Sequence, residues 1–158
     1  MKIGDKIECE FMATNNLSAN LADYAGKWLV LYFYPKDSTP GCTTEGQCFR
    51  DAYSQFQELN TEIFGVSRDG LKSHNNFKIK QQFPFELISD GEGKLCELFD
   101  VIKMKSMFGK QALGIERSTF IIDGQGVLRH EWRKVKVKGH VDEVLATLKK
   151  LQQSISNK

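Results

Sequence analysis

Long hydrophobic runs and strong excess charge are both missing from this sequence. No stretch approaches the roughly 18 apolar residues of a membrane-spanning helix, so we expect no membrane insertion. The first residues, Met1 to Lys6, lack the apolar core of a secretory signal, and we therefore expect a cytoplasmic protein. A formal net charge of +2 favours neither a nucleic acid nor any other strongly charged partner.

C-x-x-C pairs are also missing. The four cysteines are Cys9, Cys42, Cys48 and Cys96. Their spacing disfavours a zinc site and lacks the C-x-x-C motif of dithiol oxidoreductases. Thiols are kept reduced in the cytoplasm, so these residues are expected to serve catalysis, redox chemistry or core packing.

Internal repeats, low-complexity segments and linkers are absent as well. The 158 residues fit a single domain, 1–158, which is long enough to bury a core of its own. The tail, 152–158, is expected to be frayed. The histidines lie far apart in the sequence, and we expect them at the surface or at helix caps. They are His74, His130 and His140.

The strongest local pattern begins with the unbroken apolar run Leu29–Tyr34, which is typical of a strand covered on both faces. Pro40 and Gly41 then predict a turn. From Thr43 to Leu59 apolar residues recur at helical spacing. Cys42 is therefore expected at a helix N-terminus, where free N–H groups and the helix dipole favour a thiolate. We expect the turn to expose this thiol, which makes it a candidate nucleophile.

The remaining patterns alternate between strands and helices, which predicts an α/β protein with a central mixed β-sheet flanked by helices. Residues 103–114 are polar and contain two glycines and three lysines, so we expect a solvated loop there. The other expected elements are strands at 7–11, 62–67, 85–88, 117–123 and 127–133, and helices at 74–82 with Ser73 as its cap, 94–99 and 141–151.

The pattern Pro35-x-x-x-Thr39-x-x-Cys42 matches the active-site signature of peroxiredoxins. The longer string from Phe33 to Glu45 resembles the PrxQ, or bacterioferritin comigratory protein, subfamily. Two further segments agree with this resemblance, 114–123 and 139–145. The resemblance implies a thioredoxin-like fold, a monomer, and a peroxidase that needs no metal, haem or flavin.

The resemblance also assigns roles to individual residues. Cys42 would be the peroxidatic cysteine, whose thiolate attacks a peroxide oxygen and becomes a sulfenic acid. Arg117 would stabilise the thiolate and orient the peroxide. Thr39 would hold the peroxide with its hydroxyl, and Pro35 would shield the thiolate from water. Glu45 would either join the arginine or complement the helix N-terminus.

The second cysteine of the cycle departs from the subfamily pattern. Resembling proteins carry it where this sequence has Gln47 or Lys78. The candidates that remain are Cys48, Cys96 and Cys9, and we expect Cys96 and Cys9 to be core residues. The other alternative is a one-cysteine cycle, in which an external thiol reduces the sulfenic acid directly.

Cys48 can bond to Cys42 only if the helix between them opens. Six residues of α-helix correspond to a rise of about 9 Å, whereas a disulfide needs Cα atoms within about 7 Å. Gly46 lowers helix propensity by about 1 kcal/mol relative to alanine and would favour such opening. We therefore place Cys48 ahead of the one-cysteine cycle.

Taken together, the sequence predicts a thiol peroxidase that reduces hydrogen peroxide and organic hydroperoxides and is recycled by thioredoxin or a similar dithiol donor. Two alternatives remain open on the same fold. One is a dithiol–disulfide oxidoreductase, which the missing C-x-x-C motif disfavours. The other is a non-enzymatic redox sensor that uses oxidation of Cys42 as a switch.

Overall fold

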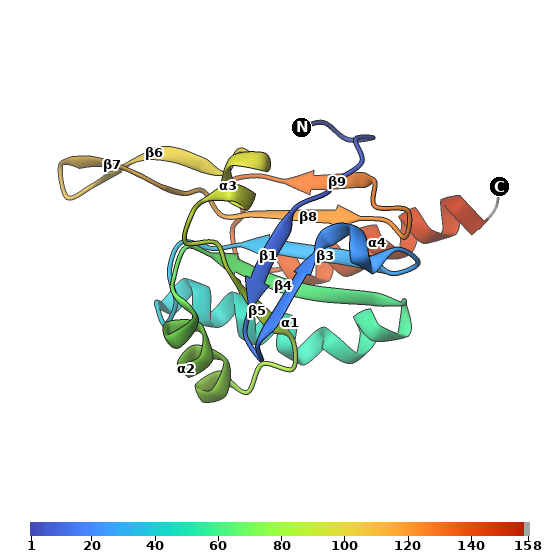
Figure 1. The fold of residues 1–158 in the computed structure, drawn as a ribbon, viewed down its shortest axis with the longest axis horizontal. Coiled ribbons are helices and arrows are strands. Elements are labelled where there is room, and N and C mark those ends of the chain that lie inside the picture. Colours follow the sequence, from blue (N-terminus) through green and yellow to red (C-terminus); the bar gives the residue numbers. More distant parts are fainter. Residues whose placement is uncertain (157–158) are drawn as a thin grey trace.

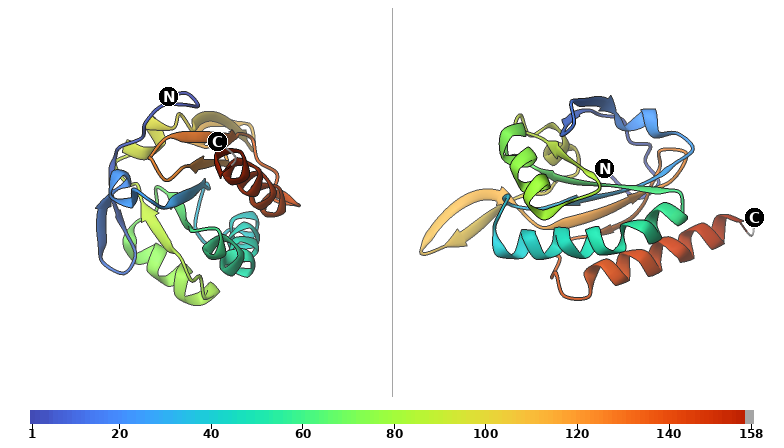
Figure 2. Two further views of the ribbon diagram at one scale, coloured as in Figure 1. Left: turned by 90° about the vertical axis from the view of Figure 1, so that its right-hand side faces the viewer. Right: turned by 90° about the horizontal axis from the view of Figure 1, so that it is seen from below.

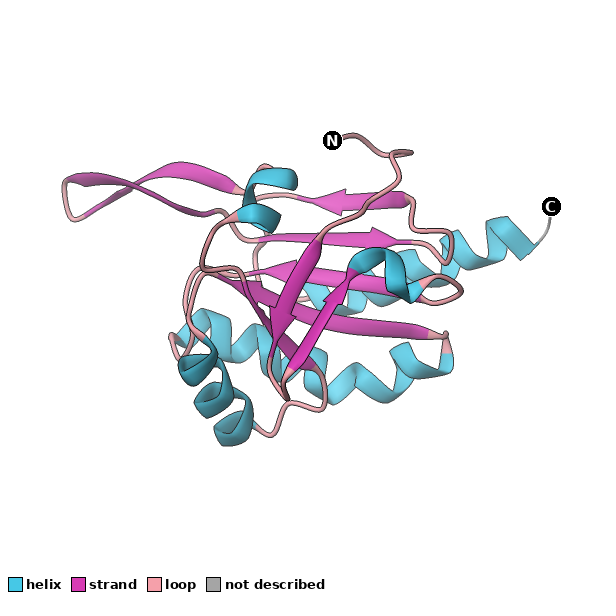
Figure 3. Ribbon diagram, in the orientation of Figure 1, coloured by secondary structure: helices cyan, strands magenta, loops and turns pink. Residues whose placement is uncertain are grey.

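A computed structural model describes residues 1–156 and shows helices packed on both faces of a central sheet (Figures 1 and 3). The elements in chain order are β1 (Glu10–Ala13), β2 (Leu17–Asn20), the 3₁₀ helix η1 (Leu21–Tyr24), β3 (Trp28–Phe33), α1 (Pro40–Glu58), β4 (Thr61–Ser67), α2 (Leu71–Gln81), β5 (Glu86–Ser89), α3 (Lys94–Leu98), β6 (Ile102–Met107), β7 (Lys110–Ile115), β8 (Ser118–Ile122), β9 (Leu128–Trp132) and α4 (His140–Ser156).

The central sheet has seven strands in the order β2-β1-β5-β4-β3-β8-β9. Strands β3, β4 and β5 run parallel to one another. The other neighbouring pairs are antiparallel. This mixed sheet with flanking helices confirms the predicted α/β architecture. Strand β3 lies near the centre of the sheet and pairs with β4 on one side and β8 on the other.

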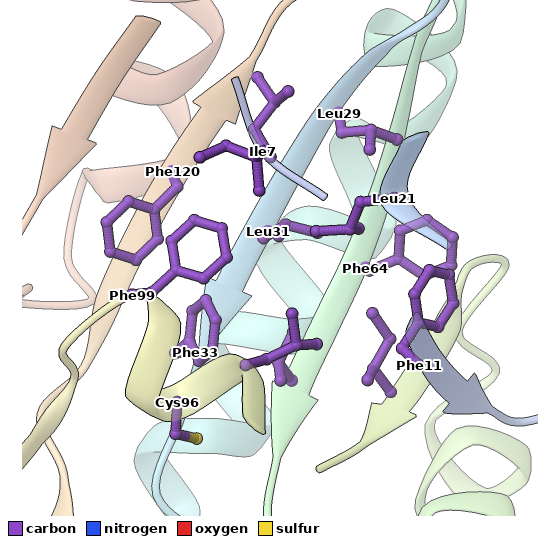
Figure 4. Close-up of a cluster of buried hydrophobic side chains, with 14 of the residues drawn as sticks. Ile7, Phe11, Leu21, Leu29, Leu31, Phe33, Phe64, Cys96, Phe99 and Phe120 are labelled. Atoms are coloured by element: carbon purple, nitrogen blue, oxygen red, sulfur yellow. The ribbon is translucent and has the colours of Figure 1, made fainter. Parts of the chain in front are cut away.

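Each face of the sheet buries its own hydrophobic cluster. Successive side chains of a strand point to opposite faces. In β3, Leu31 and Phe33 pack against α3, η1 and the N-terminal segment, on what we call the α3 face (Figure 4). Val30 and Tyr32 pack against α1, α2 and α4, on the α1 face. Because both faces of β3 are covered, its sequence is apolar throughout, as the run Leu29–Tyr34 predicted.

Helix α1 begins three residues earlier than the sequence pattern indicated. Thr39 is its N-cap, and Pro40 occupies the first helical position. Proline is favoured there because its missing N–H would have no partner within the helix and its fixed φ suits the helix. Pro40 and Gly41 therefore belong to the helix, and the predicted turn at these residues is wrong. Cys42 is the third helical residue.

Helix α2 also begins earlier than predicted. Its N-cap is Gly70, and the assignment of Ser73 as the cap is wrong. The Ser73 hydroxyl instead donates a hydrogen bond to Asp37 Oδ2 at 2.8 Å. Ser73 therefore bonds to the loop that follows β3, although the local sequence pattern predicted that it would cap the helix.

The predicted loop at 103–114 is wrong, because β6 and β7 form an antiparallel hairpin that projects from one end of the molecule (Figure 1). Phe108 and Gly109 have φ values of 53° and 79°, as a two-residue hairpin turn requires. Met104 is 60% exposed and Leu113 is 67% exposed. Since the ribbon has no buried apolar face along much of its length, its sequence shows no clear alternation.

Helix α4 lies beside α1 on the α1 face (Figure 2). It continues to Ser156, and Gln152 Nε2 donates a hydrogen bond to Leu59 O at 2.7 Å. Residues 152–156, for which we expect fraying, thus belong to α4 in the structure, and residues 157 and 158 lie outside the described part of the chain. Within that described part, no helix combines the length and apolarity needed to cross a membrane.

Candidate active site

Cys42 lies in the first turn of α1, directly after the loop that follows β3. The first backbone hydrogen bond of this turn runs from Thr43 N to Thr39 O at 2.9 Å. The N–H groups of Gly41 and Cys42 precede that bond, so the helix itself leaves them without an acceptor. The Cys42 side chain is only 2% exposed. The expectation of an exposed thiol is wrong, because the residue faces the core from within a helix.

Arg117 reaches Cys42 because β8 pairs with β3. Ser118 is opposite Phe33 in that pairing, which places Arg117 beside the end of β3 where the loop to α1 begins. Arg117 Nη2 donates to Cys42 Sγ at 3.4 Å. A Cβ atom at Gly41 would lie 3.3 Å from the same nitrogen, so glycine at this position leaves room for the guanidinium.

Glu45 contacts the same arginine, one turn further along α1. Arg117 Nη1 donates to Glu45 Oε1 at 2.6 Å. Of the two alternatives expected for Glu45, this contact favours the one in which Glu45 joins the arginine. Its side chain is fully buried, and burial raises the pKa of Glu45 to about 7 although the guanidinium opposes this shift.

Thr39 and Pro35 lie on the loop before α1. Thr39 Oγ1 donates to Lys36 O at 2.8 Å. Because its proton is used in that bond, the hydroxyl oxygen retains lone pairs that can accept a hydrogen bond from a ligand. Pro35 follows β3 and is exposed. Its role as a shield of the thiolate stays a prediction.

Residues 3–131 match the AhpC/TSA family. The chain belongs to this family. It is 60% identical over 129 residues to peroxiredoxin Bcp of Xanthomonas campestris, covering 82% of this chain and 81% of that protein. It is 53% identical over 154 residues to peroxiredoxin Bcp of Bacillus subtilis, covering 97% of this chain and 98% of that protein.

Solved structures agree with this assignment. A variant of Xylella fastidiosa PrxQ superposes with a TM-score of 0.91 at 46% identity and covers 96% of this chain and 98% of its own. Xanthomonas campestris peroxiredoxin Q superposes with a TM-score of 0.85 at 55% identity, over 89% of each chain. The predicted thioredoxin-like fold and membership of the PrxQ/Bcp subfamily are confirmed, and the protein is a thiol peroxidase.

The other cysteines of this peroxiredoxin are divided between the two faces of the sheet. Cys48 packs at the edge of the α1-face cluster that contains Cys42. Cys96 is buried in the α3-face cluster (Figure 4). Cys9 packs against the same cluster. The sheet therefore separates both from Cys42. Burial and a hydrogen bond with Asp90 raise the pKa of Cys96 far above its usual range, which suits a core thiol.

A buried polar network anchors the loop between β3 and α1, and the sequence did not reveal it. Asp37 Oδ1 accepts from the Tyr34 hydroxyl at 2.6 Å. His74 Nδ1 lies 2.7 Å from Asp37 Oδ2, and its Nε2 lies 2.9 Å from Ile88 O. His74 is fully buried, so its expected place at the surface or at a cap is wrong. The network fixes the loop to α2.

Asp37 and His74, together with Asp69, also place three potential metal-ligand atoms within 4.8 Å of one another. These atoms already serve hydrogen bonds within the protein. Asp69 Oδ2 accepts from Asp37 N at 2.9 Å and from Ser67 Oγ at 2.6 Å. We therefore interpret this cluster as part of the polar network, and not as a metal centre.

Two further groups near the site were missed because only the fold brings them there. Lys105 extends from β6, and burial together with the charge of Arg117 lowers the pKa of Lys105. His140 begins α4, and its Nε2 lies 2.8 Å from Thr119 Oγ1. Burial lowers the pKa of His140 to about 4, so this ring is neutral at pH 7. It is 4% exposed, and the expected surface or capping position is wrong.

Proposed function

We propose that this peroxiredoxin reduces hydrogen peroxide and organic hydroperoxides with the Cys42 thiolate. The observation that carries the proposal is the 3.4 Å contact from Arg117 Nη2 to Cys42 Sγ. A guanidinium at this position stabilises a thiolate and presents N–H donors to a bound oxygen. The solved structure of a Xanthomonas campestris relative concerns alkyl peroxide reduction, which supports including organic hydroperoxides.

The geometry suits a displacement at oxygen. The Cys42 sulfur attacks one peroxide oxygen, an S–O bond forms, and the O–O bond breaks. The other oxygen leaves and is protonated to water or an alcohol, while Cys42 becomes a sulfenic acid. Thr39 Oγ1 accepts a hydrogen bond from the peroxide, and the N–H groups of Gly41 and Cys42 stabilise the developing negative charge.

The return of Cys42 to the thiolate requires local opening of α1. With the side chain 2% exposed, neither Cys48 nor an external thiol reaches the sulfur in the closed helix. Cys48 is the first candidate for the resolving residue because it shares α1 and the α1 face with Cys42. Thioredoxin or a similar dithiol donor would then reduce the disulfide. The proposal also retains a monomer acting in the cytoplasm, and the one-cysteine cycle as its alternative.

Peroxide consumption in a reconstituted thioredoxin system tests the catalytic assignment. The wild-type protein should consume peroxide, and Cys42→Ser should reduce the rate to that of the reductant alone. Cys96→Ser is the matched control, because its thiol lies across the sheet and its loss should leave the rate within about threefold. Equal rates for wild type and Cys42→Ser would contradict the proposal.

Mass spectrometry after one equivalent of peroxide, followed by peptide mapping, tests the resolving step. A bond between Cys42 and Cys48 is the expected product. A persistent sulfenic acid at Cys42 would establish the one-cysteine cycle instead. Mapping of Cys42 to Cys96 would contradict the separation of these residues by the sheet. Size-exclusion chromatography with light scattering tests the monomer, and subcellular fractionation tests the cytoplasmic location.

A further inference from the structure

Two acidic groups share one guanidinium behind the proposed peroxide site. Arg117 Nη1 contacts Glu45 Oε1 at 2.6 Å, and Nη2 contacts Cys42 Sγ at 3.4 Å. The arginine carries a single positive charge. If the thiolate and the carboxylate were both ionised, this buried pocket would hold a net negative charge, which a low-dielectric site disfavours. A proton on one of the two groups removes that charge.

The carboxyl group of Glu45 is the better place for this proton. Its side chain is fully buried, and Oε2 has no hydrogen-bond partner among the residues that the structure describes. An ionised carboxylate would leave negative charge on an oxygen without donors, whereas a neutral acid carries the proton there at lower cost. The upward shift of the Glu45 pKa to about 7 agrees with this arrangement.

The surrounding elements present no second cation in direct contact with Glu45 within residues 1–156. Tyr32 on β3 is buried and neutral, since burial raises its pKa well above the usual range. His140 on α4 is neutral at pH 7. Cys48 on α1 has its pKa raised, mainly by burial, and Lys105 on β6 interacts with Arg117 and Cys42. The charge on Arg117 therefore links the protonation of Glu45 to the state of Cys42.

We propose that Glu45 stores the proton that neutralises the oxygen leaving the peroxide. The proposal rests on the peroxidase function given above. Before attack, Cys42 is a thiolate and Glu45 is a neutral acid. When the S–O bond forms and the O–O bond breaks, the sulfur loses its negative charge and the leaving oxygen gains it. Arg117 is then free to stabilise a Glu45 carboxylate.

The released proton converts the leaving hydroxide or alkoxide into water or alcohol, so no proton from solution is consumed in this step. Reduction of the sulfenic acid by thiols later gives a Cys42 thiol. As that thiol ionises against Arg117, its proton returns to Glu45 and the starting state is restored. Glu45 thus holds the proton that the leaving oxygen takes up, and the charge of Arg117 links its release to the loss of the thiolate.

Proton uptake during a single turnover tests this inference. The protein is mixed with one equivalent of hydrogen peroxide in weakly buffered solution, and a pH indicator counts the protons taken up per sulfenic acid formed. At about pH 6 the wild-type protein should take up fewer than about 0.3 protons, because Glu45 supplies them. At about pH 8, where Glu45 is already ionised, the count should approach one.

Glu45→Gln should take up about one proton per sulfenic acid at both pH values, because an amide stores none. Glutamine keeps an oxygen for Arg117 and mimics the neutral acid, so the ultraviolet absorbance of the thiolate should persist at pH 6. Glu62→Gln is the matched control. Glu62 is a half-buried carboxylate on β4 that accepts from Tyr53 at 2.9 Å, and this variant should behave as wild type.

Three results would overturn the inference. The first is uptake of a full proton by the wild-type protein at pH 6 with the thiolate absorbance present. The second is a Glu45→Gln protein that takes up none, and the third is loss of its thiolate absorbance. If Glu45→Gln does not fold, the wild-type change between pH 6 and 8 still decides, provided that the thiolate absorbance is present at both pH values. A wild-type protein that consumes no peroxide would instead refute the proposed function.

Discussion

Arg117 carries the chemistry of the site through the shape of its side chain as well as its charge. The planar guanidinium presents two N–H groups in a fixed fork, which contact Cys42 and Glu45 simultaneously. Burial lowers the pKa of Arg117, but the charge interactions and hydrogen bonds with Glu45 and Cys42 outweigh that effect and raise it. A lysine at this position would supply a point charge without the fork.

Arg117→Lys should therefore reduce the second-order rate constant for peroxide by about a hundredfold, the usual scale for losing one well-placed oriented donor. The measurement is peroxide consumption at limiting peroxide concentration. Arg129→Lys is the matched control, because Arg129 forms a 3.7 Å ion pair with Asp123 away from Cys42. A loss of less than about threefold in Arg117→Lys would show that charge alone suffices.

The raised pKa of Glu45 should also make the free energy of unfolding depend on pH. The unfolded chain releases this proton near pH 4.5, whereas the native state holds it to about pH 7. Rising pH therefore removes stability from the native state across this window. Relative to Glu45→Gln, the wild-type free energy of unfolding should fall by about 3 kcal/mol between pH 4 and 7.5.

Urea unfolding of both proteins at several pH values measures this difference. The comparison with Glu45→Gln is needed because His140 acts in the opposite direction. Its pKa is lowered from 6.5 to about 4, so its contribution to stability is lost as the pH falls through that range. The His140 term is common to both proteins and cancels. A constant difference between them would contradict the raised pKa of Glu45.

The first half of α1 packs against the end of α2 and the segment that leads from α2 to β5. A Cβ atom at Gly46 would overlap the ring of Phe83, so glycine here permits close packing. Gln47 Nε2 donates to Gln81 Oε1 at 2.9 Å in the same contact. Opening of α1 toward Cys48 must therefore displace Phe83. The low helix propensity of Gly46 favours this opening, whereas the packing of Phe83 opposes it.

Phe83→Ala should make this opening easier. Loss of the ring should lower the free energy of unfolding by about 3 kcal/mol and accelerate the disappearance of the Cys42 sulfenic acid after one equivalent of peroxide. Quenched mass spectrometry follows that species in time. The control is Phe99→Ala, which removes a ring of the same size from the α3 face. If the sulfenic acid disappears equally fast in Phe99→Ala, the acceleration reflects general destabilisation of the protein and not local opening of α1.

At the scale of the whole molecule, the sheet sorts the four thiols into two environments. Cys42 and Cys48 lie on the α1 face, and Cys96 and Cys9 lie on the α3 face. Strand β3 and its neighbours stand between the two groups. A disulfide across the sheet would require the central strands to separate, which amounts to unfolding of the domain core.

The double variant Cys9→Ser, Cys96→Ser should therefore keep thioredoxin-dependent peroxide turnover within about threefold of wild type. Adding Cys48→Ser to that background should abolish turnover if Cys48 is the resolving residue. Steady-state peroxide consumption measures both. Because the double variant lacks Cys9 and Cys96, peptide mapping of its oxidised form can detect only a disulfide between Cys42 and Cys48. Loss of turnover in the double variant alone would contradict the division of thiols between the two faces.

The sequence alone identified the elements whose pattern is local. The apolar run of β3, the helical spacing of α1 and the fixed spacing around Cys42 depend on neighbouring residues, so they can be recognised without a fold. The first turn of α1 was missed because proline suits both a turn and a helix start. The β6–β7 hairpin was missed because a ribbon exposed along much of its length shows no clear hydrophobic alternation.

Only the tertiary structure decided which distant groups meet. Arg117 is 72 residues from Glu45 and 75 from Cys42 in the chain, and pairing of β8 with β3 brings them together. Among the residues that the structure describes, the same packing buries Glu45 Oε2 without a hydrogen-bond partner, and it encloses His74. Burial and the number of hydrogen-bond partners determine whether a carboxyl group keeps its proton. Both depend on how separate elements pack, which residue spacing along the chain does not specify.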